Sequence, residues 1–401
     1  MRSKVVVKNV TKVFGKSSKN ALRLLDKGYS KEEILKETGS TIGVNGANFE
    51  IFPGEIFVVM GLSGSGKSTL IRMLNRLIEP TAGQIFVDDV DIVKMNSHQL
   101  RDFRQKKISM VFQNFALFPH KTILENTEYG LEIQKVPQAD RRSKALQSLE
   151  IVGLKGYEYQ YPSQLSGGMQ QRVGLARALA SDTDIVLMDE AFSALDPLIR
   201  KDMQDELLEL QETMQKTIIF ITHDLDEALR IGDRIALMKD GHIIQIGTPE
   251  EIMMNPANEY VERFVEDVDL SKVLTAAHVQ KRAERITPDR GPRVALQIMR
   301  DQGVSSIFVV DRRQRLLGAI TAEDASMALI KDKTVDEVIQ KNIGVVLEDT
   351  LLTEVIDASA TSVLPLAVVD DDGRLKGVII RGAIIGALAG KNADYNSKEV
   401  N

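Results

Sequence analysis

A glycine-rich segment that follows an apolar run constrains this chain more than any other part of the sequence. The predicted strand before it covers 56–60, and the predicted helix after it covers 69–77. Glycines let backbone N–H groups curl around phosphate oxygens, and the N-terminus of a helix adds positive potential. The segment therefore predicts a phosphate-binding loop, which by itself does not name a function. It fits G-x-x-x-x-G-K-[ST] and consists of Gly61, Leu62, Ser63, Gly64, Ser65, Gly66, Lys67, Ser68 and Thr69.

Residues of this loop and two carboxylates predict nucleotide hydrolysis. We expect Lys67 to reach the β- and γ-phosphates and the Ser68 hydroxyl to ligate Mg²⁺. The apolar run 185–188 ends in Asp189 and Glu190. Asp189 would hold the Mg²⁺, and Glu190 would polarise the attacking water as general base.

Three further features lie at the ends of predicted strands or helices. Gln113 follows the predicted strand 108–112 and could contact Mg²⁺ and water. His223 follows a strand and could reach a γ-phosphate, although such a histidine is more often a loop residue satisfied by its neighbours. Ser166, Gly167 and Gly168 open a predicted helix and leave its N–H groups bare, which indicates a second phosphate-binding surface.

The pattern of apolar runs predicts the fold class. Runs at 185–188, 218–221 and 235–238 alternate with helical patterns such as 198–214, which is typical of an α/β domain with a largely parallel sheet. A capping box at 30–33 predicts a short helix that Gly39 ends.

Composition excludes several classes of function. The 401 residues include 51 Lys and Arg against 57 Asp and Glu, and the net charge of −6 provides no general field for nucleic acid. Because the chain contains no Cys, it has no disulfide, thiolate metal site or Cys nucleophile. We recognise neither a signal-peptide core nor a membrane-spanning stretch, so we expect a soluble cytoplasmic protein that reaches a membrane only through a partner.

The last third of the chain contains an internal repeat. The run 307–311 with Gly318 aligns with 366–370 and Gly377 at a constant offset, 370 − 311 = 59 and 377 − 318 = 59. Each copy predicts a strand, a polar turn, a second strand and a helix, with another helix before them at 293–299 or 351–358. Coincidence between two β-hairpins is the alternative, and the shared register favours a true repeat.

Together the motifs resemble those of the nucleotide-binding subunits of ATP-binding cassette (ABC) transporters, over about 5–267. The resemblance implies ATP and Mg²⁺ as cofactors and a homodimer paired head to tail, with each ATP between the Walker A loop of one copy and the signature motif of the other. The corresponding residues are Lys67 in Walker A, Gln113 in the Q-loop, Ser166 to Gly168 in the signature, Asp189 and Glu190 in Walker B, Ser193 to Asp196 in the D-loop, and His223 as the switch histidine.

Further residues resemble one branch of that family. The position of Phe14 suggests the aromatic that stacks on adenine, an ordinary turn residue being the alternative. The distance from Phe14 to Gly61, 61 − 14 = 47 positions, indicates an insertion at about 16–43, which could be a solvated surface loop. The insertion, the Walker A sequence and the segment 189–200 resemble the ATPase subunits of glycine betaine/proline-type quaternary ammonium importers. The C-terminal repeat resembles the tandem of CBS domains that this branch carries.

The resemblance implies a domain plan and a function. We expect an α/β fold: a P-loop ABC ATPase domain with a signature-helix subdomain at 1–269, a linker at 270–279, α/β CBS domains at 280–333 and 334–390, and a polar tail at 391–401. The protein would be the ATP-hydrolysing motor of an importer that takes up glycine betaine or related osmolytes in osmotic stress. Its partners would be integral membrane permease subunits with a betaine-binding component, which hold it at the cytoplasmic face of the cell membrane. The loop 115–120 after the Q-loop is expected to dock that permease.

The motif pattern differs from those of two other classes of ABC ATPase. A chromosome- or repair-type ATPase would place a long coiled coil between Lys67 and Ser166, but the 166 − 67 = 99 positions carry no sustained heptads. A translation-type ATPase would have two cassettes, and this chain has one Walker A loop and one signature. A motor for a different substrate, or a nucleotide-sensing regulatory module, stays open as the alternative.

The two CBS copies are not equivalent in sequence. Copy one places Thr321 and Asp324 where the CBS pattern binds a nucleotide's phosphate and ribose, whereas copy two has Ile380 and Ala383 at those places. One adenine-based ligand, such as a cyclic dinucleotide, is a candidate. A tandem that only dimerises the cassettes, or that senses ionic strength, is an equal alternative.

Overall fold

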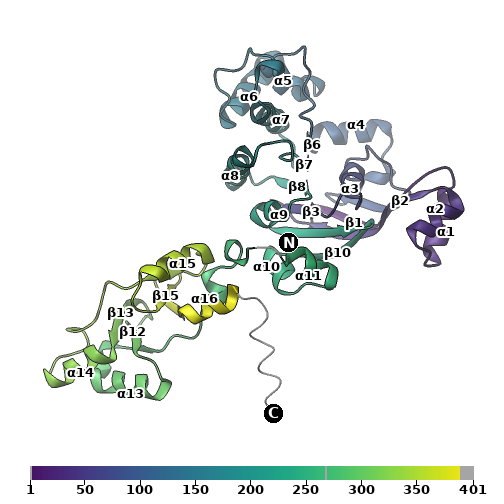
Figure 1. The fold of residues 1–401 in the computed structure, drawn as a ribbon. Helices are drawn as coiled ribbons and strands as arrows, with labels where there is room; N and C mark the ends of the chain where they lie inside the picture. Colours follow the sequence, from purple (N-terminus) through teal and green to yellow (C-terminus); the bar gives the residue numbers. More distant parts are fainter. Residues whose placement is uncertain (1, 267–268, 389–401) are drawn as a thin grey trace. The chain divides into compact units, whose positions relative to one another are not determined.

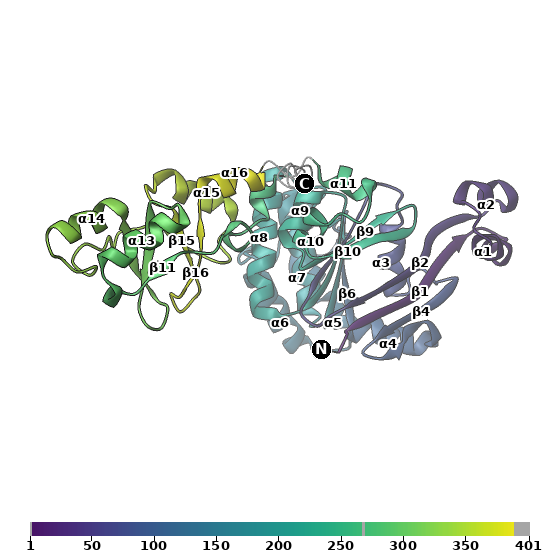
Figure 2. The ribbon, with the colours of Figure 1, turned by 90° about the horizontal axis from the view of Figure 1, so that it is seen from below.

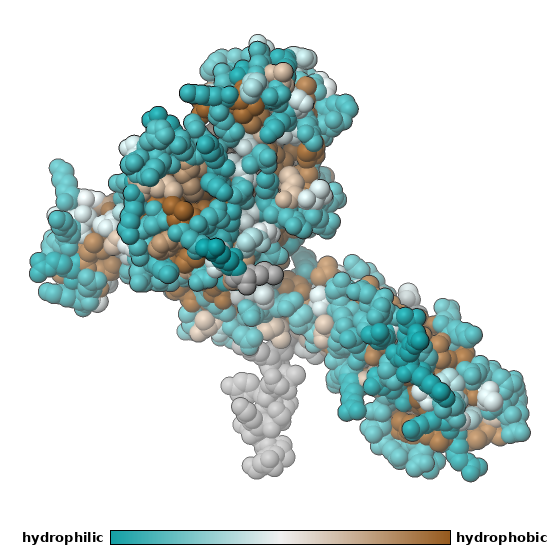
Figure 3. Space-filling model, turned by 180° about the vertical axis from the view of Figure 1, so that it is seen from behind, coloured by the Kyte–Doolittle hydropathy of each residue, from teal (hydrophilic) through white to brown (hydrophobic). Residues whose placement is uncertain are grey.

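The computed structural model describes residues 2–266 and 269–388 (Figure 1). Contacts divide the chain into two compact units, 1–267 and 268–401, and each has hydrophobic clusters of its own. On the face drawn in Figure 3, patches of apolar residues are scattered over a largely hydrophilic surface.

A six-stranded sheet of order β10-β9-β3-β8-β7-β6 forms the centre of the first unit. Five of the strands run parallel, and β10 pairs antiparallel with β9. Every residue of β3, β7 and β8 is buried, as expected for parallel strands covered on both faces, so the predicted sheet is confirmed. The strands are β3 (Ile56–Met60), β6 (Ile108–Phe112), β7 (Ile185–Asp189), β8 (Thr217–Thr222), β9 (Arg234–Lys239) and β10 (His242–Gly247).

Helices surround this sheet. Three of them, α5 (Ile123–Ile133), α6 (Gln138–Ile151) and α7 (Gly167–Ala180), contact one another and form a lobe beside β6 (Figure 1). The pattern at 198–214 correctly predicts α8. The other helical segments are α3 (Lys67–Leu74), α4 (Ser97–Lys106), α8 (Pro197–Met214), α9 (Leu225–Ile231), α10 (Pro249–Met254) and α11 (Glu259–Val265), with 3₁₀ turns at Ile92–Lys94 and Pro162–Gln164.

A four-stranded antiparallel sheet of order β2-β1-β4-β5 completes the unit. Its strands are β1 (Val5–Phe14), β2 (Thr41–Ile51), β4 (Ala82–Val87) and β5 (Val90–Asp91). Between β1 and β2 the chain forms two helices, α1 (Ser18–Asp26) and α2 (Lys31–Thr38), which lie together at one end of this sheet (Figures 1 and 2). The predicted capped helix is α2, which has a capping box at Ser30 and ends at left-handed Gly39; sequence reasoning missed α1.

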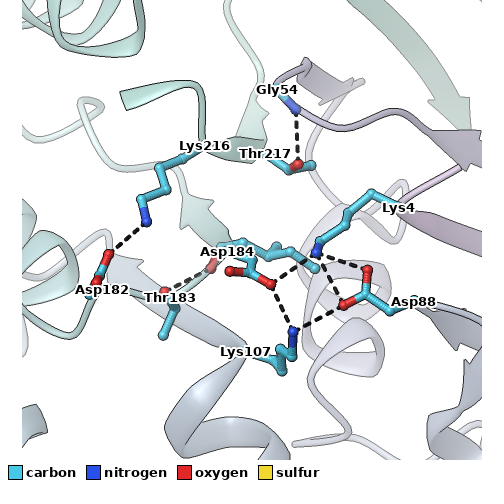
Figure 4. A network of polar contacts seen from close by, with 10 residues as sticks. Lys4, Gly54, Asp88, Lys107, Asp182, Thr183, Asp184, Lys216 and Thr217 are labelled. Carbon is cyan, nitrogen blue, oxygen red and sulfur yellow. Dashed lines mark hydrogen bonds and ion pairs between the residues drawn. The ribbon is translucent and has the colours of Figure 1, made fainter. Parts of the chain in front are cut away.

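Charged side chains meet at the amino ends of the parallel strands (Figure 4). The ammonium groups of Lys4 and Lys107 each lie 2.9 Å from Oδ2 of Asp184, and both also contact the Asp88 carboxylate. Burial tends to raise the pKa of Asp88 and of Asp184, but hydrogen bonds from the two lysines outweigh it and lower both pKa values. The network ties the starts of β1, β6 and β7 to the turn after β4.

The second unit contains two similar three-stranded sheets, β11-β12-β13 and β14-β15-β16. Val309 pairs with Gly318 in one sheet and Val368 with Gly377 in the other, so the predicted repeat is confirmed in its register. The strands are β11 (Arg285–Ile286), β12 (Ser306–Val310), β13 (Leu316–Thr321), β14 (Val345–Leu347), β15 (Leu366–Val369) and β16 (Leu375–Ile379). The helices are α12 (Ala276–Val279), α13 (Pro292–Gln302), α14 (Ala322–Ile330), α15 (Leu352–Thr361) and α16 (Arg381–Leu388), with 3₁₀ turns at Leu270–Lys272 and Pro288–Arg290.

The sequence predicts a polar C-terminal tail and no membrane-spanning helix. The polar tail predicted at 391–401 lies outside the described residues. Within 2–266 and 269–388, no helix has both the length and the apolar character needed to cross a bilayer.

Candidate functional site

The loop between β3 and α3 depends on two glycines that no other residue could replace without displacing the backbone. Gly61 has φ +148°, and a Cβ there would lie 2.2 Å from the carbonyl oxygen of Met238. Gly66 has φ +105°, and a Cβ there would lie 2.3 Å from the carbonyl oxygen of Gly43. The loop is therefore pressed against β9 and β2, while its residues 62–64 are exposed.

Two buried side chains of this loop carry hydrogen-bond donors. The buried ammonium of Lys67 donates to the carbonyl oxygens of Gly61, at 2.7 Å, and Leu62, at 3.1 Å. Burial lowers the pKa of Lys67, and the charges of Glu190 and Asp189 oppose that shift. The hydroxyl of Ser65 is buried and has no hydrogen-bond partner in the described part of the chain. These donors fit a phosphate group.

The next residues along α3 approach the end of β7. The Ser68 hydroxyl donates to Oδ1 of Asp189 at 3.1 Å, and the Arg72 guanidinium donates to Oδ2 of the same carboxylate at 3.1 Å. Thr69 places its methyl group 3.5 Å from where a Cβ of Gly43 would stand. A hydroxyl and a carboxylate are ligands that Mg²⁺ accepts beside phosphate and water oxygens, so this pair fits the metal. No group of three His, Cys, Asp or Glu that could hold a metal occurs in the described ranges.

Glu190 is the centre of a polar cluster at the ends of three adjacent strands. Its Oε2 accepts from Nε2 of Gln113 at 3.2 Å and lies 3.6 Å from Nδ1 of His223. The backbone of Glu190 is left-handed, with φ +48°, and its carbonyl accepts from the Ser193 hydroxyl at 2.9 Å. The structure thus brings together three residues that the sequence singled out separately. Ser193, which also accepts from Gln113 at 3.2 Å, was expected only as part of a motif.

The signature residues and Asp196 make no hydrogen bond or ion pair with this cluster among the described residues. Ser166 is the N-cap of α7 and accepts from the N–H of Met169 at 3.4 Å. Ser166, Gly167 and Asp196 are exposed, and Asp196 precedes α8. A Cβ on Gly168 would lie 2.7 Å from Ile199 of α8, so the segment 166–168 and the start of α8 are neighbours. No hydrogen bond or ion pair among the described residues joins Ser166 to Lys67 or Glu190.

Phe14 lies at the end of β1, beside the phosphate-binding loop. Its side chain is 42% exposed, and the position of a Cβ on Gly43 is 2.7 Å from the ring. The ammonium of Lys12 is 5.1 Å from the ring centroid. The carbonyl oxygen of the same Gly43 lies 2.3 Å from the Cβ position of Gly66, so the exposed ring lies next to the phosphate-binding loop.

Thr321 and Asp324 of the second unit form a reciprocal cap on α14. The Thr321 hydroxyl donates to Oδ2 of Asp324 at 2.7 Å, and the N–H of Asp324 donates to the Thr321 hydroxyl at 3.0 Å. Gln340, which the sequence did not reveal, donates to the same carboxylate oxygen at 2.7 Å. The two predicted residues lie together, and the cap gives both of them a structural role.

Comparison with known proteins identifies the family. The ABC transporter model matches residues 44–193, and the CBS domain model matches 278–331 and 335–390. The glycine betaine transport ATP-binding protein OpuAA of Bacillus subtilis (strain 168) is 64% identical over 398 residues, which cover 99% of this chain and 95% of that protein. This chain is an ABC transporter ATP-binding protein. Its predicted ABC ATPase fold and its CBS tandem are confirmed.

This ABC ATPase is also similar to a second curated transport protein and to solved ABC cassettes. The glycine betaine/carnitine transport ATP-binding protein GbuA of Listeria monocytogenes serotype 1/2a (strain 10403S) is 56% identical over 98% of this chain and 100% of its own length. The structure of the dimeric bacterial ABC transporter cassette MJ0796 matches 61% of this chain and 98% of its own with 33% identity and a TM-score of 0.52. A second structure of that cassette, with the same identity and TM-score, holds ADP and Pi.

The segment after Gln113 in this ABC ATPase is anchored by groups that sequence reasoning missed. Phe115 and Ala116 both have left-handed backbones, with φ +57° and +49°. The Arg177 guanidinium of α7 donates to their carbonyl oxygens at 3.0 and 2.7 Å. Fully buried Asn126 of α5 binds both the N–H and the carbonyl of Phe118. Sequence gives little signal for such side-chain-to-backbone contacts across elements.

Proposed function

We propose that this chain is the ATP-hydrolysing motor subunit of an importer for glycine betaine or related quaternary ammonium osmolytes. The observation that carries the proposal is the 64% identity to a glycine betaine transport ATP-binding protein across 99% of the chain, both the insertion and the CBS tandem included. In this proposal the importer acts in osmotic stress, and its permease and betaine-binding components hold the chain at the cytoplasmic face of the membrane.

The geometry supports a division of labour for hydrolysis. Loop N–H groups and the Lys67 ammonium would bind the β- and γ-phosphates after Lys67 leaves the carbonyls that it now contacts. Ser68 and Asp189 would hold Mg²⁺, which neutralises phosphate charge when bound. Glu190 would take the proton of the attacking water, and Gln113 and His223, which both face its carboxylate, would orient that water and sense the γ-phosphate.

A homodimer would complete the site. Ser166, Gly167 and Asp196 are exposed and make no hydrogen bond with the Glu190 cluster among the described residues, so this surface is available to a second copy. We infer that these residues face the nucleotide that is held by the phosphate-binding loop of the second copy. Phe14 would stack on the adenine of the nucleotide that is held by its own loop. The dimeric cassette among the similar structures supports this arrangement.

The other components are assigned to two surfaces. The loop 115–120, held by Arg177 and Asn126, is the proposed docking surface for the permease. The CBS tandem is the proposed regulator, and Thr321 with Asp324 is the candidate contact for an adenine-based ligand such as a cyclic dinucleotide. Dimerisation of the cassettes or sensing of ionic strength would be the alternative role of the tandem.

The variant Glu190→Gln tests the motor. It keeps the hydrogen-bonding shape but removes the base, and loss of a positioned base typically lowers turnover by about 10²–10⁴-fold. The variant should still bind ATP, and in the presence of ATP it should elute as a stable dimer in size-exclusion chromatography. Normal steady-state ATPase activity would remove Glu190 from the mechanism.

Uptake of labelled betaine in hyperosmotic medium by cells with and without the chain tests the substrate. Equal uptake by the two kinds of cell would favour a different substrate.

A further inference from the structure

The insertion between β1 and β2 is a packed element rather than a loose surface loop. Ile34 of α2 and Ala21 of α1 are fully buried, and they form a cluster with Leu24 and with Val13 and Ile42 of the flanking strands. This packing fixes α2 relative to the ends of β1 and β2. The first residue of α2 is Lys31, directly after the N-cap Ser30.

The Lys31 side chain reaches the phosphate-binding loop through one glycine. Its Nζ lies 3.1 Å, and its Cε 3.3 Å, from where a Cβ of Gly241 would stand. The N–H of Gly241 donates to the carbonyl of Ser65 in the loop at 2.9 Å. The carbonyl of Gly43 lies 3.1 Å from that same Cβ position on Gly241 and touches Gly66. Lys31 therefore borders the place where the loop, β2 and the β9–β10 turn meet.

The Lys31 ammonium is partly buried, and its burial is compensated only in part. In the described part of the chain it makes no hydrogen bond and no ion pair. Burial lowers the pKa of Lys31, and the attraction of Asp240 opposes this only in part. His242 also faces it, and the pKa of His242 is lowered by burial and by the Lys31 charge. A cation that loses water with only partial compensation is destabilised, and an incoming anion would reverse this.

The path of the nucleotide indicates which anion this is. Gly43 is the shared neighbour of these groups: Phe14 and Thr69 lie beside its Cβ position, and its carbonyl oxygen lies beside the Cβ positions of Gly66 and Gly241. A nucleotide that stacks on Phe14 and binds the loop would therefore lie next to Gly43, close to the segment that Lys31 borders. We propose that Lys31, supplied by the insertion, binds the phosphate chain of the nucleotide at its base-proximal end and so adds a cation to the site besides Lys67. The proposal rests on the proposed binding of ATP by the loop.

The test compares nucleotide binding by full-length Lys31→Met and a matched control, Lys36→Met, which removes an exposed lysine from the same helix. Equilibrium titrations use ATP, ADP and adenosine. We expect Lys31→Met to weaken ATP and ADP binding by about 10-fold or more, the loss expected for one hydrogen bond between charged groups, and to leave adenosine binding unchanged. Lys36→Met should match the wild type, and Lys31→Arg should restore most of the affinity. Equal melting temperatures would show that the variants fold.

The outcomes separate the inference from the proposed function. Wild-type affinity for ATP and ADP in Lys31→Met would overturn the inference and leave the proposed function intact. Equal losses for ATP and adenosine would also overturn it, because a phosphate contact cannot act on adenosine. If Lys31→Met does not fold, the ATP and ADP affinities of Lys31→Gln decide in the same way. A wild-type chain that binds no ATP would overturn the proposed function itself.

Discussion

Replacing Arg177 with Met should release the segment that follows Gln113 without unfolding the cassette. Phe115 and Ala116 hold left-handed backbones, which cost non-glycine residues roughly 1–2 kcal/mol each. Arg177 donates to both carbonyls, and a hydrogen bond to a charged group contributes about 1.5–3 kcal/mol. The two contacts are therefore about large enough to offset the strain of the two residues. Burial lowers the pKa of Arg177, which has no carboxylate partner among the described residues.

The expected result is a local effect rather than a global one. In Arg177→Met the two residues can relax, so the strain energy is recovered and the free energy of global unfolding should change by less than about 2 kcal/mol. Local opening should become easier by about 2 kcal/mol, which corresponds to roughly 30-fold faster amide exchange. Because Gln113 lies two residues upstream, ATP turnover should fall while ATP affinity is kept.

Hydrogen–deuterium exchange of peptides covering 113–118 measures this, with urea unfolding as the global reference. Arg177→Lys keeps the charge but loses the forked donor geometry and should give intermediate protection. Arg172→Met is the matched control, because Arg172 lies on the same helix and contacts Val152 and Glu206 instead. Wild-type protection of 113–118 in Arg177→Met would refute the reasoning, as would an equal change in Arg172→Met.

Three further predictions follow from other contacts. Asn126→Ala should lower the free energy of unfolding by about 2–4 kcal/mol in urea titrations, since it leaves buried backbone groups of the loop without partners; an unchanged midpoint would contradict this. The pKa values of Asp88 and Asp184 are lowered in the folded state, so their ion pairs with the lysines stabilise the fold above about pH 4, and this stabilisation is lost as pH falls through the folded-state pKa values. Lys107→Met lacks part of these ion pairs, so its free energy of unfolding should fall less than that of the wild type between about pH 5 and pH 2. The difference should be about 1 kcal/mol or less, because the pairs are partly exposed. Asp324→Ala should abolish any calorimetric heat of a cyclic adenine dinucleotide on the full chain; no heat with the wild type would leave the tandem as an assembly or salt-sensing element.

Residues whose role depends on a short stretch of neighbouring residues were predictable from the sequence. The glycines around Lys67 are demanded by the backbone of the loop, and their spacing is a pattern within nine residues. Asp189 and Glu190 end an apolar run, and the end of a buried strand is where polar groups become available. The repeat was visible because a strand pair imposes the same register twice, and Val309 and Val368 pair accordingly.

Contacts between distant segments were not predictable in this way. Nothing near Arg177 in the sequence indicates that it binds the carbonyls of Phe115 and Ala116, since a carbonyl acceptor has no residue identity. Gln340 meets Asp324 only because the chain returns to β13 after α14. The helix α1 was missed because its first turn has no acidic residue and its N-cap makes no side-chain hydrogen bond, so the usual start signals are absent.

The parallel sheet separates chemistry from stability along the direction of its strands. The candidate catalytic groups follow the carboxyl ends of β3, β6, β7 and β8, where Lys67, Gln113, Glu190 and His223 occur. The amino ends of the same strands carry the charged network of Figure 4, in which Lys107 directly precedes β6. In an open α/β sheet the ligand occupies the carboxyl edge, so the two sets of charges act at opposite ends of the strands. Changes at the amino edge should therefore alter unfolding and leave ATP affinity unchanged.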